Sequence, residues 1–459
     1  MPVPRLAIAA CLLFSPTLAS ADSEPDLRIA KLLAEVSPAR LEATLRKLES
    51  FQTRHTLSSP DTPGRGVGAA REWILAEMKG YSPRLQVSFD TYRIPKQGER
   101  ITRETELRNV MAILPGKTPR RFYVSGHYDS LARPVASPRP GTPPPPSPSP
   151  SPRSAGGGFD WIRTDNVAPG VNDDGSGTAL TMELARLFAQ SGLEFDATLV
   201  FICFAGEEEG LVGAKLHAQR AEAEKLVIDG VLNNDIVGNA VGGQGVKDTS
   251  TVRVFSEGPE DSPSRSLARA VRRDAALYVP EHRVRLIARY DRFGRGGDHS
   301  AFNQHGYAGV RFTESKENYA HQHTALDTFA GGVDPDYLAR NARVNAAALA
   351  TLGLAPAAPV VVDERGRTLL GREPSGYDAR LRWTASPGAV GYRVFWREAW
   401  TPDWQFERAV GNVTELVMPG VSIDDYVFGV AALDADGHES LVSAYVNPNR
   451  PETPIQTLP

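Results

Sequence analysis

The chain has 459 residues, of which 41% are hydrophobic and 23% are charged, and its formal net charge is −4. This composition is typical of a globular protein with room for two or three domains. Nucleic-acid binding is not favoured because the net charge is negative and no basic cluster stands out. No apolar run is long enough to span a bilayer.

Residues 1–21 read as a secretory signal peptide, so we expect a secreted protein, extracellular or periplasmic. Arg5 supplies the positive start, residues 6–14 form the apolar stretch, and Ala19-Ser20-Ala21 is a small-residue cleavage site. The mature chain then keeps one cysteine, Cys203, within an apolar run. We expect it to be a buried small hydrophobe without a disulfide partner.

Between residues 37 and 352, apolar strands alternate with amphipathic helices. Strands that are apolar throughout indicate a sheet buried on both faces, which is the pattern of α/β proteins. The expected helices cover residues 37–51, 66–78, 176–190, 211–223, 262–273 and 336–352. The expected strands cover residues 85–92, 109–114, 122–125, 197–204, 227–232, 252–256 and 308–312, with a loop at 296–302.

Two segments differ in character from this pattern. Residues 131–158 are dominated by proline, serine and glycine, which predicts an extended insertion in a surface loop of the first domain, residues 22–355. Beyond residue 355 the helical patterns end, and short alternating strands are expected at 379–383, 391–396, 415–418 and 425–432. These strands predict a small all-β sandwich over residues 356–450.

Acids and imidazoles lie where several of the expected strands end. His127, Glu208 and Asp235 each follow an apolar strand, Asp173 precedes a helix, and His323 lies in a late loop. In α/β proteins, ligands collect at the carboxyl ends of the strands. A mixed set of imidazoles and carboxylates suits zinc, with manganese or cobalt as alternatives. Five such side chains hold two metal ions if one carboxylate bridges them, which fits hydrolytic chemistry.

Asp173 is the candidate bridge. It lies in the glycine-bounded turn Gly170–Gly177, where two adjacent carboxylates repel each other unless a cation holds them. Asparagine, aspartate and serine are also typical of helix N-caps, so the turn taken alone favours a cap. The coincidence of several acid or imidazole positions at strand ends favours the metal.

Two further acids have predicted roles beside the ligands. Adjacent side chains of an extended chain point apart, so Glu207 faces the open position if Glu208 binds metal. Glu207 is then the candidate general base, which takes a proton from water and delivers it to the leaving amine. Asp129 lies two residues after His127, where it is expected to accept the hydrogen bond from the other imidazole nitrogen.

Three segments carry a resemblance to a known family. Residues 126–130 (GHYDS), 169–177 (PGVNDDGSG) and 204–213 (FAGEEEGLVG) resemble the motifs of the two-zinc aminopeptidases. These enzymes form metallopeptidase family twenty-eight, which also contains glutamate carboxypeptidase-like enzymes. Asp235, residues 323–327 and the loop 297–302 complete the resemblance, which spans Leu27 to Leu354.

The resemblance implies a three-layer α/β/α domain with a mixed, mainly parallel sheet that hydrolyses N-terminal peptide bonds. It implies two zinc ions, Glu207 as general base, and a cis peptide bond between Asp173 and Asp174. It also assigns the ligands: His127, Asp173 and Asp235 for one ion, and Asp173, Glu208 and His323 for the other.

The sequence departs from the family where many relatives carry a tyrosine before the last histidine, because Gln322 stands there. Tyr319 or Tyr290 is a candidate replacement. Arg292 and Arg295 are candidates either for contact with a substrate carbonyl or carboxylate or for surface salt bridges. His321 and His299 have no place in the ligand scheme, and we expect core or surface roles for both.

The C-terminal segment resembles a fibronectin type III module through Trp383, Tyr392 and the strand at 426–432. Such a module spaces or anchors, and it is a candidate contact with a surface or partner. For the whole chain, the leading hypothesis is a secreted aminopeptidase acting on peptide or protein N-termini. The alternatives are a carboxypeptidase or dipeptidase of the same family, and a non-catalytic binding protein on the peptidase scaffold.

Overall fold

The computed structural model describes residues 24–132, 161 and 163–446. The expected signal peptide and residues 133–158 of the proline-rich insertion lie outside the described residues. None of the helices in the described ranges is long and apolar enough to cross a membrane.

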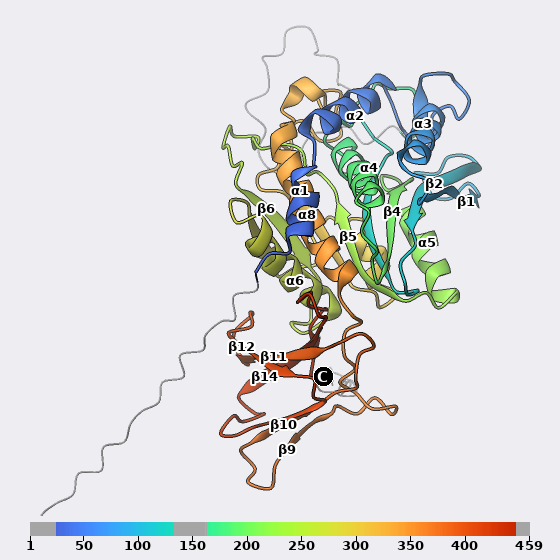
Figure 1. Cartoon of the computed structure of the whole chain (residues 1–459). Coiled ribbons are helices and arrows are strands. Elements are labelled where there is room, and N and C mark those ends of the chain that lie inside the picture. Colours follow the sequence, from blue (N-terminus) through green and yellow to red (C-terminus); the bar gives the residue numbers. More distant parts are fainter. Residues whose placement is uncertain (1–23, 133–160, 162, 447–459) are drawn as a thin grey trace, which may run out of the picture.

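An eight-stranded sheet forms the centre of the larger part of the molecule (Figure 1), with the strand order β1-β2-β4-β3-β5-β8-β6-β7. The pairs β3–β4, β3–β5, β5–β8 and β6–β7 are parallel, and the other pairs are antiparallel. The strands are β1 (Gln86–Ile94), β2 (Thr105–Leu114), β3 (Arg121–His127), β4 (Thr198–Phe204), β5 (Ile228–Asn234), β6 (Thr251–Ser256), β7 (Arg283–Ile287) and β8 (Gly309–Glu314).

Helices cover both faces of this sheet. The larger apolar core lies against α1 (Leu27–Ala34), α2 (Pro38–Ser50), α3 (Gly66–Tyr81), α4 (Gly175–Gln190), α6 (Pro263–Tyr278) and α8 (Pro335–Leu354). The opposite face packs on α5 (Val212–Ala223) and α7 (His299–Asn303).

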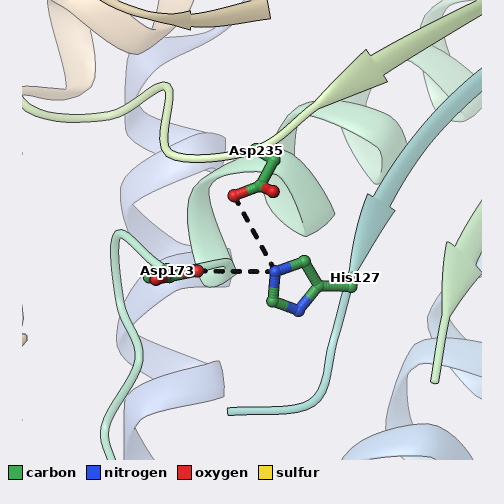
Figure 2. Close-up of side chains that lie close together, drawn as sticks. All are labelled: His127, Asp173 and Asp235. Atoms are coloured by element: carbon green, nitrogen blue, oxygen red, sulfur yellow. Dashed lines mark ion pairs between the residues drawn. The ribbon is translucent and has the colours of Figure 1, made fainter. Parts of the chain in front are cut away.

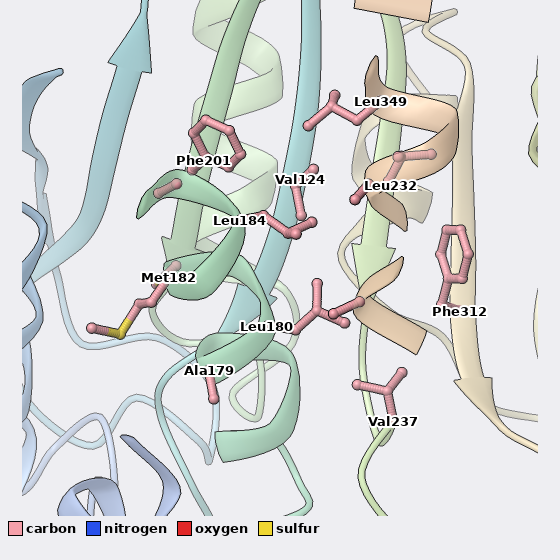
Figure 3. Close-up of a cluster of buried hydrophobic side chains, with 14 of the residues drawn as sticks. Val124, Ala179, Leu180, Met182, Leu184, Phe201, Leu232, Val237, Phe312 and Leu349 are labelled. Carbon is pink, nitrogen blue, oxygen red and sulfur yellow. The ribbon is translucent and has the colours of Figure 1, made fainter. Parts of the chain in front are cut away.

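Strand β4 shows why this arrangement has three layers. Its alternate residues Phe201 and Cys203 belong to the larger core, whereas Ile202 and Phe204 belong to the core under α5 and α7. Successive side chains of a strand point to opposite faces, so a strand that is apolar throughout needs cover on both sides. Figure 3 shows Phe201 and Leu184 of α4 among the side chains of the larger core. The predicted fold class, with its mixed and mainly parallel sheet, is confirmed.

The expected elements of this part are present, with ends that differ by a few residues. Three features differ from expectation. The structure adds helix α1 and strand β7, and the expected loop at 296–302 contains the short helix α7. Cys203 is a buried free cysteine, as predicted, and burial raises its pKa.

The C-terminal segment forms two antiparallel sheets, in the orders β13-β10-β9 and β12-β11-β14-β15. One apolar core joins them, with Trp383 and Tyr392 at a ring-centroid distance of 5.5 Å. The strands are β9 (Leu370–Arg372), β10 (Ala379–Arg382), β11 (Gly391–Glu398), β12 (Phe406–Gly411), β13 (Glu415–Met418), β14 (Tyr426–Leu433) and β15 (Ser443–Ala444).

The two parts of the molecule meet along α6 and α1. On α6, Arg269 Nε donates to the carbonyl oxygen of Pro402 at 2.9 Å, and Arg272 Nη2 lies 2.8 Å from Asp403 Oδ1. At the start of α1, the N-cap residue Asp26 lies 3.0 Å from His438 Nε2. The contact between the parts is therefore mainly one of charged and polar groups.

Candidate functional site

The structure brings together the five side chains that the sequence proposes as metal ligands. They come from separate elements that end at one edge of the sheet. His127 ends β3, Glu208 follows β4, Asp235 follows β5, Asp173 lies in the turn before α4, and His323 lies in the loop after β8. They form two groups that share Asp173, and within each group the candidate ligand atoms lie within 4.8 Å of one another.

The first group contains His127, Asp173 and Asp235, whose side chains point toward one another (Figure 2). His127 Nε2 lies 3.4 Å from Asp173 Oδ1 and 3.8 Å from Asp235 Oδ1. All three side chains are buried, and among the described residues neither His127 Nε2 nor Asp235 Oδ1 has a hydrogen-bond partner. Buried polar atoms without a hydrogen-bond partner, when they are possible metal ligands, fit a cation held between them.

The second group contains Asp173, Glu208 and His323. His323 Nε2 lies 3.0 Å from Asp173 Oδ2 and 3.1 Å from Glu208 Oε2. Asp173 therefore presents one carboxylate oxygen to each imidazole, which is the geometry expected of a bridging ligand. Burial opposes its charged form, but the nearby imidazoles of His323 and His127 lower the pKa of Asp173 well below its ordinary value.

The turn that carries Asp173 is also a helix start, and the two roles fall on adjacent residues. Asp174 is the N-cap of α4: its Oδ1 accepts the N–H of Gly177 at 2.8 Å, and its Oδ2 accepts the N–H of His127 at 2.9 Å. The expectation that Ser176 begins the helix is wrong, because Ser176 lies within α4. The peptide bond between Asp173 and Asp174 is cis, as the family resemblance implies.

Close packing explains part of the glycine content around this turn. A Cβ atom at Gly126, in β3, would lie 2.4 Å from the carbonyl carbon of Gly177, and one at Gly177 would lie 2.0 Å from the carbonyl oxygen of Asn234. Larger residues at these positions would separate α4 from β3 and β5. The approach of the three backbones places Asp173 beside His127 and Asp235.

Glu207 lies in the cleft that opens on this site. Its side chain is 13% exposed, and its Oε2 is 3.9 Å from His127 Nε2. The cleft has a volume of about 370 Å³ and is also lined by Asp173, Asp235 and His323. Burial raises the pKa of Glu207 well above its ordinary value, and the carboxylates of Asp235 and Glu208 add to this against the opposing attraction of His127. Acids crowded in this way need a cation to balance them.

Asp129 contacts the ligands in a way that its sequence position only partly indicates. His127 Nδ1 lies 3.2 Å from the backbone carbonyl oxygen of Asp129 and 3.6 Å from Oδ1. The Asp129 carboxylate accepts the backbone N–H groups of Glu207 at 3.3 Å and Glu208 at 3.1 Å. Asp129 therefore orients the Glu207–Glu208 backbone as well as the His127 ring.

Arg54 has no role in the sequence interpretation, although the structure places it under the site. It is fully buried, and Nε donates to the carbonyl oxygen of Tyr128 at 2.6 Å. Nη1 and Nη2 donate to the carbonyl oxygens of Pro169 at 2.6 Å and Gly170 at 2.7 Å. One side chain thus ties the loop after His127 to the turn before Asp173. The sequence contains no local signal for this contact.

Arg311 is a second residue that sequence reasoning missed. It lies in β8 with no exposed surface, and its Nη1 is 2.9 Å from Asp235 Oδ2 and 3.1 Å from Asp291 Oδ2. Because Asp235 Oδ2 pairs with Arg311, the other oxygen of Asp235, Oδ1, is directed toward His127. An arginine inside an apolar strand was the available signal, because a buried arginine needs a carboxylate partner.

The other residues that the sequence singled out are not part of either group. His299 is buried, and its Nε2 lies 2.7 Å from the carbonyl oxygen of Tyr290. Gln322 is buried and bonded to other side chains, and Tyr319 and Tyr290 are about half exposed. Arg292 and Arg295 line the cleft.

The chemistry of this donor set fits zinc. Two imidazoles and three carboxylates are ordinary zinc ligands, one carboxylate lies between the two groups, and an unassigned acid faces the cleft. Such an arrangement is able to hold two cations side by side and to move a proton beside them, which is the requirement for hydrolysis.

Comparisons with known proteins agree with this chemistry. The model of the family described as "Peptidase family M28" matches residues 109–349. A "Probable zinc metalloprotease" of Pyricularia oryzae is 37% identical over 456 residues, covering 91% of this chain and 84% of that protein. One of Pyrenophora teres f. teres with the same name is 36% identical over 454 residues, covering 91% of this chain and 86% of that protein.

A solved structure shares the fold. The LapA aminopeptidase of Legionella pneumophila aligns with a TM-score of 0.53 at 17% sequence identity. The alignment covers 72% of this chain and 76% of that chain.

Proposed function

The chain belongs to peptidase family M28 and is a zinc metallopeptidase, and we propose that it is a secreted two-zinc exopeptidase, specifically an aminopeptidase. The observation that carries the two-ion proposal is the position of Asp173. Its two oxygens lie 3.4 Å from His127 Nε2 and 3.0 Å from His323 Nε2. One ion would be held by His127, Asp173 and Asp235, and the other by Asp173, Glu208 and His323.

Bound zinc supplies a Lewis acid that lowers the pKa of water and polarises a carbonyl group. The remaining steps belong to side chains of this chain. Glu207, which faces the cleft, takes the proton from the attacking water at its carboxylate and returns it to the nitrogen of the leaving amine. Asp129 holds the backbone of Glu207 and Glu208 through two N–H groups, and so positions both carboxylates.

Cleavage at the N-terminus is supported by the shared fold of LapA, and it remains a proposal for this chain. The test compares a free-amine peptide with its N-acetylated form, assayed for release of the first residue. We expect the free-amine peptide to be cleaved and the acetylated peptide to be resistant. Cleavage of both from the C-terminal end would instead support the carboxypeptidase alternative. A non-catalytic binding protein is disfavoured because all five ligands and Glu207 are present.

Secretion and the C-terminal module are part of the same proposal. Residues 1–21 have the pattern of a signal peptide, so the mature protein is expected to begin at Asp22, which N-terminal sequencing tests. The two antiparallel sheets, and the packing of Trp383 on Tyr392 within their shared core, support a fibronectin type III-like module. We assign it a spacing or anchoring role.

A further inference from the structure

The charges that line the cleft are unevenly distributed. Four cationic side chains line it, namely those of Arg100, Lys215, Arg292 and Arg295. The acids in the same lining are Asp173, Glu208 and Asp235, which are the proposed ligands, and Glu207, the proposed base. When the three ligand carboxylates are bound to metal, the cationic side chains of the lining outnumber the acidic side chains that remain free to contact a substrate.

One of the four cations is neutralised by the protein itself. Arg292 Nε lies 3.0 Å from Asp291 Oδ1, and its Nη1 lies 2.7 Å from Glu317 Oε2. Both Arg292 and Glu317 are buried. Arg292 is therefore a structural ion-pair residue, although its ion pairs are buried and are not the surface salt bridges that the sequence interpretation named as an alternative.

Arg295 is different because its near partner is neutral. Its Nη1 donates to Gln322 Oε1 at 2.7 Å, and the nearest carboxylate, that of Glu317, is 4.0 Å away. Glu317 already pairs with Arg253 at 2.7 Å and with Arg292 at 2.7 Å. The charge of Arg295 is thus poorly compensated at the wall of the cleft.

Gln322 directly precedes the candidate ligand His323, and its side chain contacts Arg295. Both ends of its amide are used: Oε1 accepts from Arg295, and Nε2 donates to Glu317 Oε2 at 3.0 Å. Gln322 is therefore committed to positioning Arg295. Neither Tyr319 nor Tyr290 is among the described residues that line the cleft. The polar group offered to a substrate near His323 is the Arg295 guanidinium.

Two more cations reach the cleft from other elements. Arg100 lies between β1 and β2, where its guanidinium is 5.2 Å from the Trp161 ring centroid and Nη1 is 3.3 Å from the carbonyl oxygen of Glu208. Lys215 lies on the exposed side of α5. Within the described ranges, neither forms an ion pair with a carboxylate. A guanidinium group without a carboxylate partner in the protein, such as that of Arg100, is suited to bind a substrate carboxylate with two parallel hydrogen bonds.

We propose that the cleft selects peptides that carry a carboxylate beside the scissile bond, with Arg295, positioned by Gln322, as the principal recognition residue and Arg100 and Lys215 as supporting cations. This inference rests on the proposed peptidase function and names its substrate class. The carboxylate belongs either to an acidic side chain or to the free C-terminus of a dipeptide, and the same cations serve both.

The test uses peptides that differ only in one carboxylate. The side-chain arm compares Asp-Ala-amide with Asn-Ala-amide, and Ala-Glu-amide with Ala-Gln-amide. The terminal arm compares Ala-Ala with Ala-Ala-amide. In at least one arm, kcat/KM of the zinc-loaded enzyme should be at least about tenfold higher for the acid than for the amide. Equal values in all three comparisons would overturn the inference.

Variants then connect that preference with Arg295. Arg295→Gln should remove most of the acid-to-amide ratio of kcat/KM, and Arg100→Gln should reduce this ratio in part. Arg289→Gln is the matched control, because Arg289 stacks on Phe293 with its guanidinium 5.5 Å from the ring centroid and is not among the residues lining the cleft. A ratio that survives both cleft variants would contradict the proposal. An equal fall in kcat for acid and neutral peptides would show that Arg295 stabilises the reacting carbonyl oxygen instead.

A binding measurement separates this inference from the proposed function. The Glu207→Gln protein, loaded with zinc, is titrated with the same peptide pairs by calorimetry. Tighter binding of the acid member supports the inference even if no peptide is hydrolysed by the wild-type enzyme, a result that would reject only the proposed peptidase function. Equal binding of acid and amide, together with hydrolysis of neutral peptides, would reject only the inference.

Discussion

Asp327 Oδ2 accepts a hydrogen bond from the backbone N–H of Asp173 at 2.9 Å. The other oxygen, Oδ1, accepts the N–H of Asn172 at 2.9 Å, and the Asp327 carbonyl oxygen accepts the N–H of Val171 at 3.0 Å. The loop that carries His323 therefore holds the turn that carries the proposed bridging carboxylate. These hydrogen bonds fix the position of Asp173 relative to the loop of His323 without any contribution from a metal ion.

Replacing Asp327 should weaken zinc binding. In Asp327→Asn, one of the two acceptor oxygens becomes an NH₂ group that faces a backbone N–H, so the turn must shift. Loss of a hydrogen-bonded group that orients a ligand typically costs about 10–100-fold in metal affinity. Competition with a chelator of known zinc affinity measures the change. Asp336→Asn, at an exposed position in the first turn of α8, is the control. Equal affinity of the two variants would show that Asp327 does not support the site.

Replacing Arg54 should lower the free energy of unfolding. Arg54→Met leaves the buried carbonyl oxygens of Tyr128 and Pro169 without a donor, whereas that of Gly170 keeps the N–H of Gly175 at 2.9 Å. Each unsatisfied buried group costs about 1–3 kcal/mol, so the two groups together should cost at least about 2 kcal/mol. Burial lowers the pKa of Arg54 to about 10, so the residue is still charged at neutral pH.

Urea denaturation measures this loss, and Arg65→Met is the control because Arg65 is partly exposed and donates to a single carbonyl oxygen, that of Asp165 at 2.8 Å. Arg54→Lys should not restore stability, since one ammonium group cannot reach three carbonyl oxygens in the arrangement of a guanidinium fork. A fully stable Arg54→Lys protein would contradict this role.

Replacing Glu207 should separate catalysis from metal binding. Glu207→Gln keeps the size of the side chain but removes the proton acceptor, so we expect hydrolysis to fall by about 10²–10⁴-fold while the zinc content stays unchanged. Elemental analysis and peptide hydrolysis, measured on the same preparation, check both parts. Removing zinc from the wild-type protein with a chelator should abolish hydrolysis, and added zinc should restore it. Full activity of Glu207→Gln would eliminate Glu207 as the base.

The contact between the two parts of the molecule should depend on pH. His438 Nδ1 lies 2.7 Å from Asp434 Oδ2, and Nε2 lies 3.0 Å from Asp26 Oδ2. Burial opposes protonation, but the two carboxylates raise the pKa of His438 above its ordinary value of about 6.5. A group whose pKa is raised on folding stabilises the protein fully below the unfolded-state pKa, and this contribution is lost as pH rises through the folded-state pKa.

The free energy of unfolding of the wild type, minus that of His438→Gln, should therefore be larger at pH 6 than at pH 9. The expected change is up to about 1 kcal/mol, because the pair is partly open to solvent. Denaturation of both proteins across this range, at one zinc concentration, measures it. A difference that does not change with pH, or that grows toward pH 9, would show that His438 is not protonated at this contact.

Much of the fold was predictable because local patterns and packing agree. Strand β4 is apolar from Leu199 to Phe204 and is buried on both faces, and Ser37 followed by Pro38 begins a helix where the cap pattern expects one. The elements that the sequence did not indicate are short. Helix α1 has only 8 residues, and β15 has only 2, so neither contains enough periods of its pattern to be recognised. Their positions depend on neighbouring elements.

The candidate site was likewise predictable only in part: its ligands were predicted, but the residues that support them were not. His127, Asp173, Glu208, Asp235 and His323 stand in short motifs at strand or helix ends, so their convergence followed from α/β topology. The groups that support them did not, because Arg54 and Asp327 act on the Asp173 turn from positions 115 and 154 residues away in the chain. No local spacing encodes contacts of that range. The structure was also needed to show that Asp174 is the N-cap of α4, next to the candidate ligand Asp173.

The measurement that tests the two-zinc centre most directly is a crystal structure of the zinc-loaded protein with anomalous data collected on both sides of the zinc absorption edge. We expect two anomalous peaks about 3.5–4 Å apart. One should lie between His127, Asp173 and Asp235, and the other between Asp173, Glu208 and His323, with Asp173 in contact with both. A single peak, or a second zinc away from Asp173, would contradict the two-zinc centre.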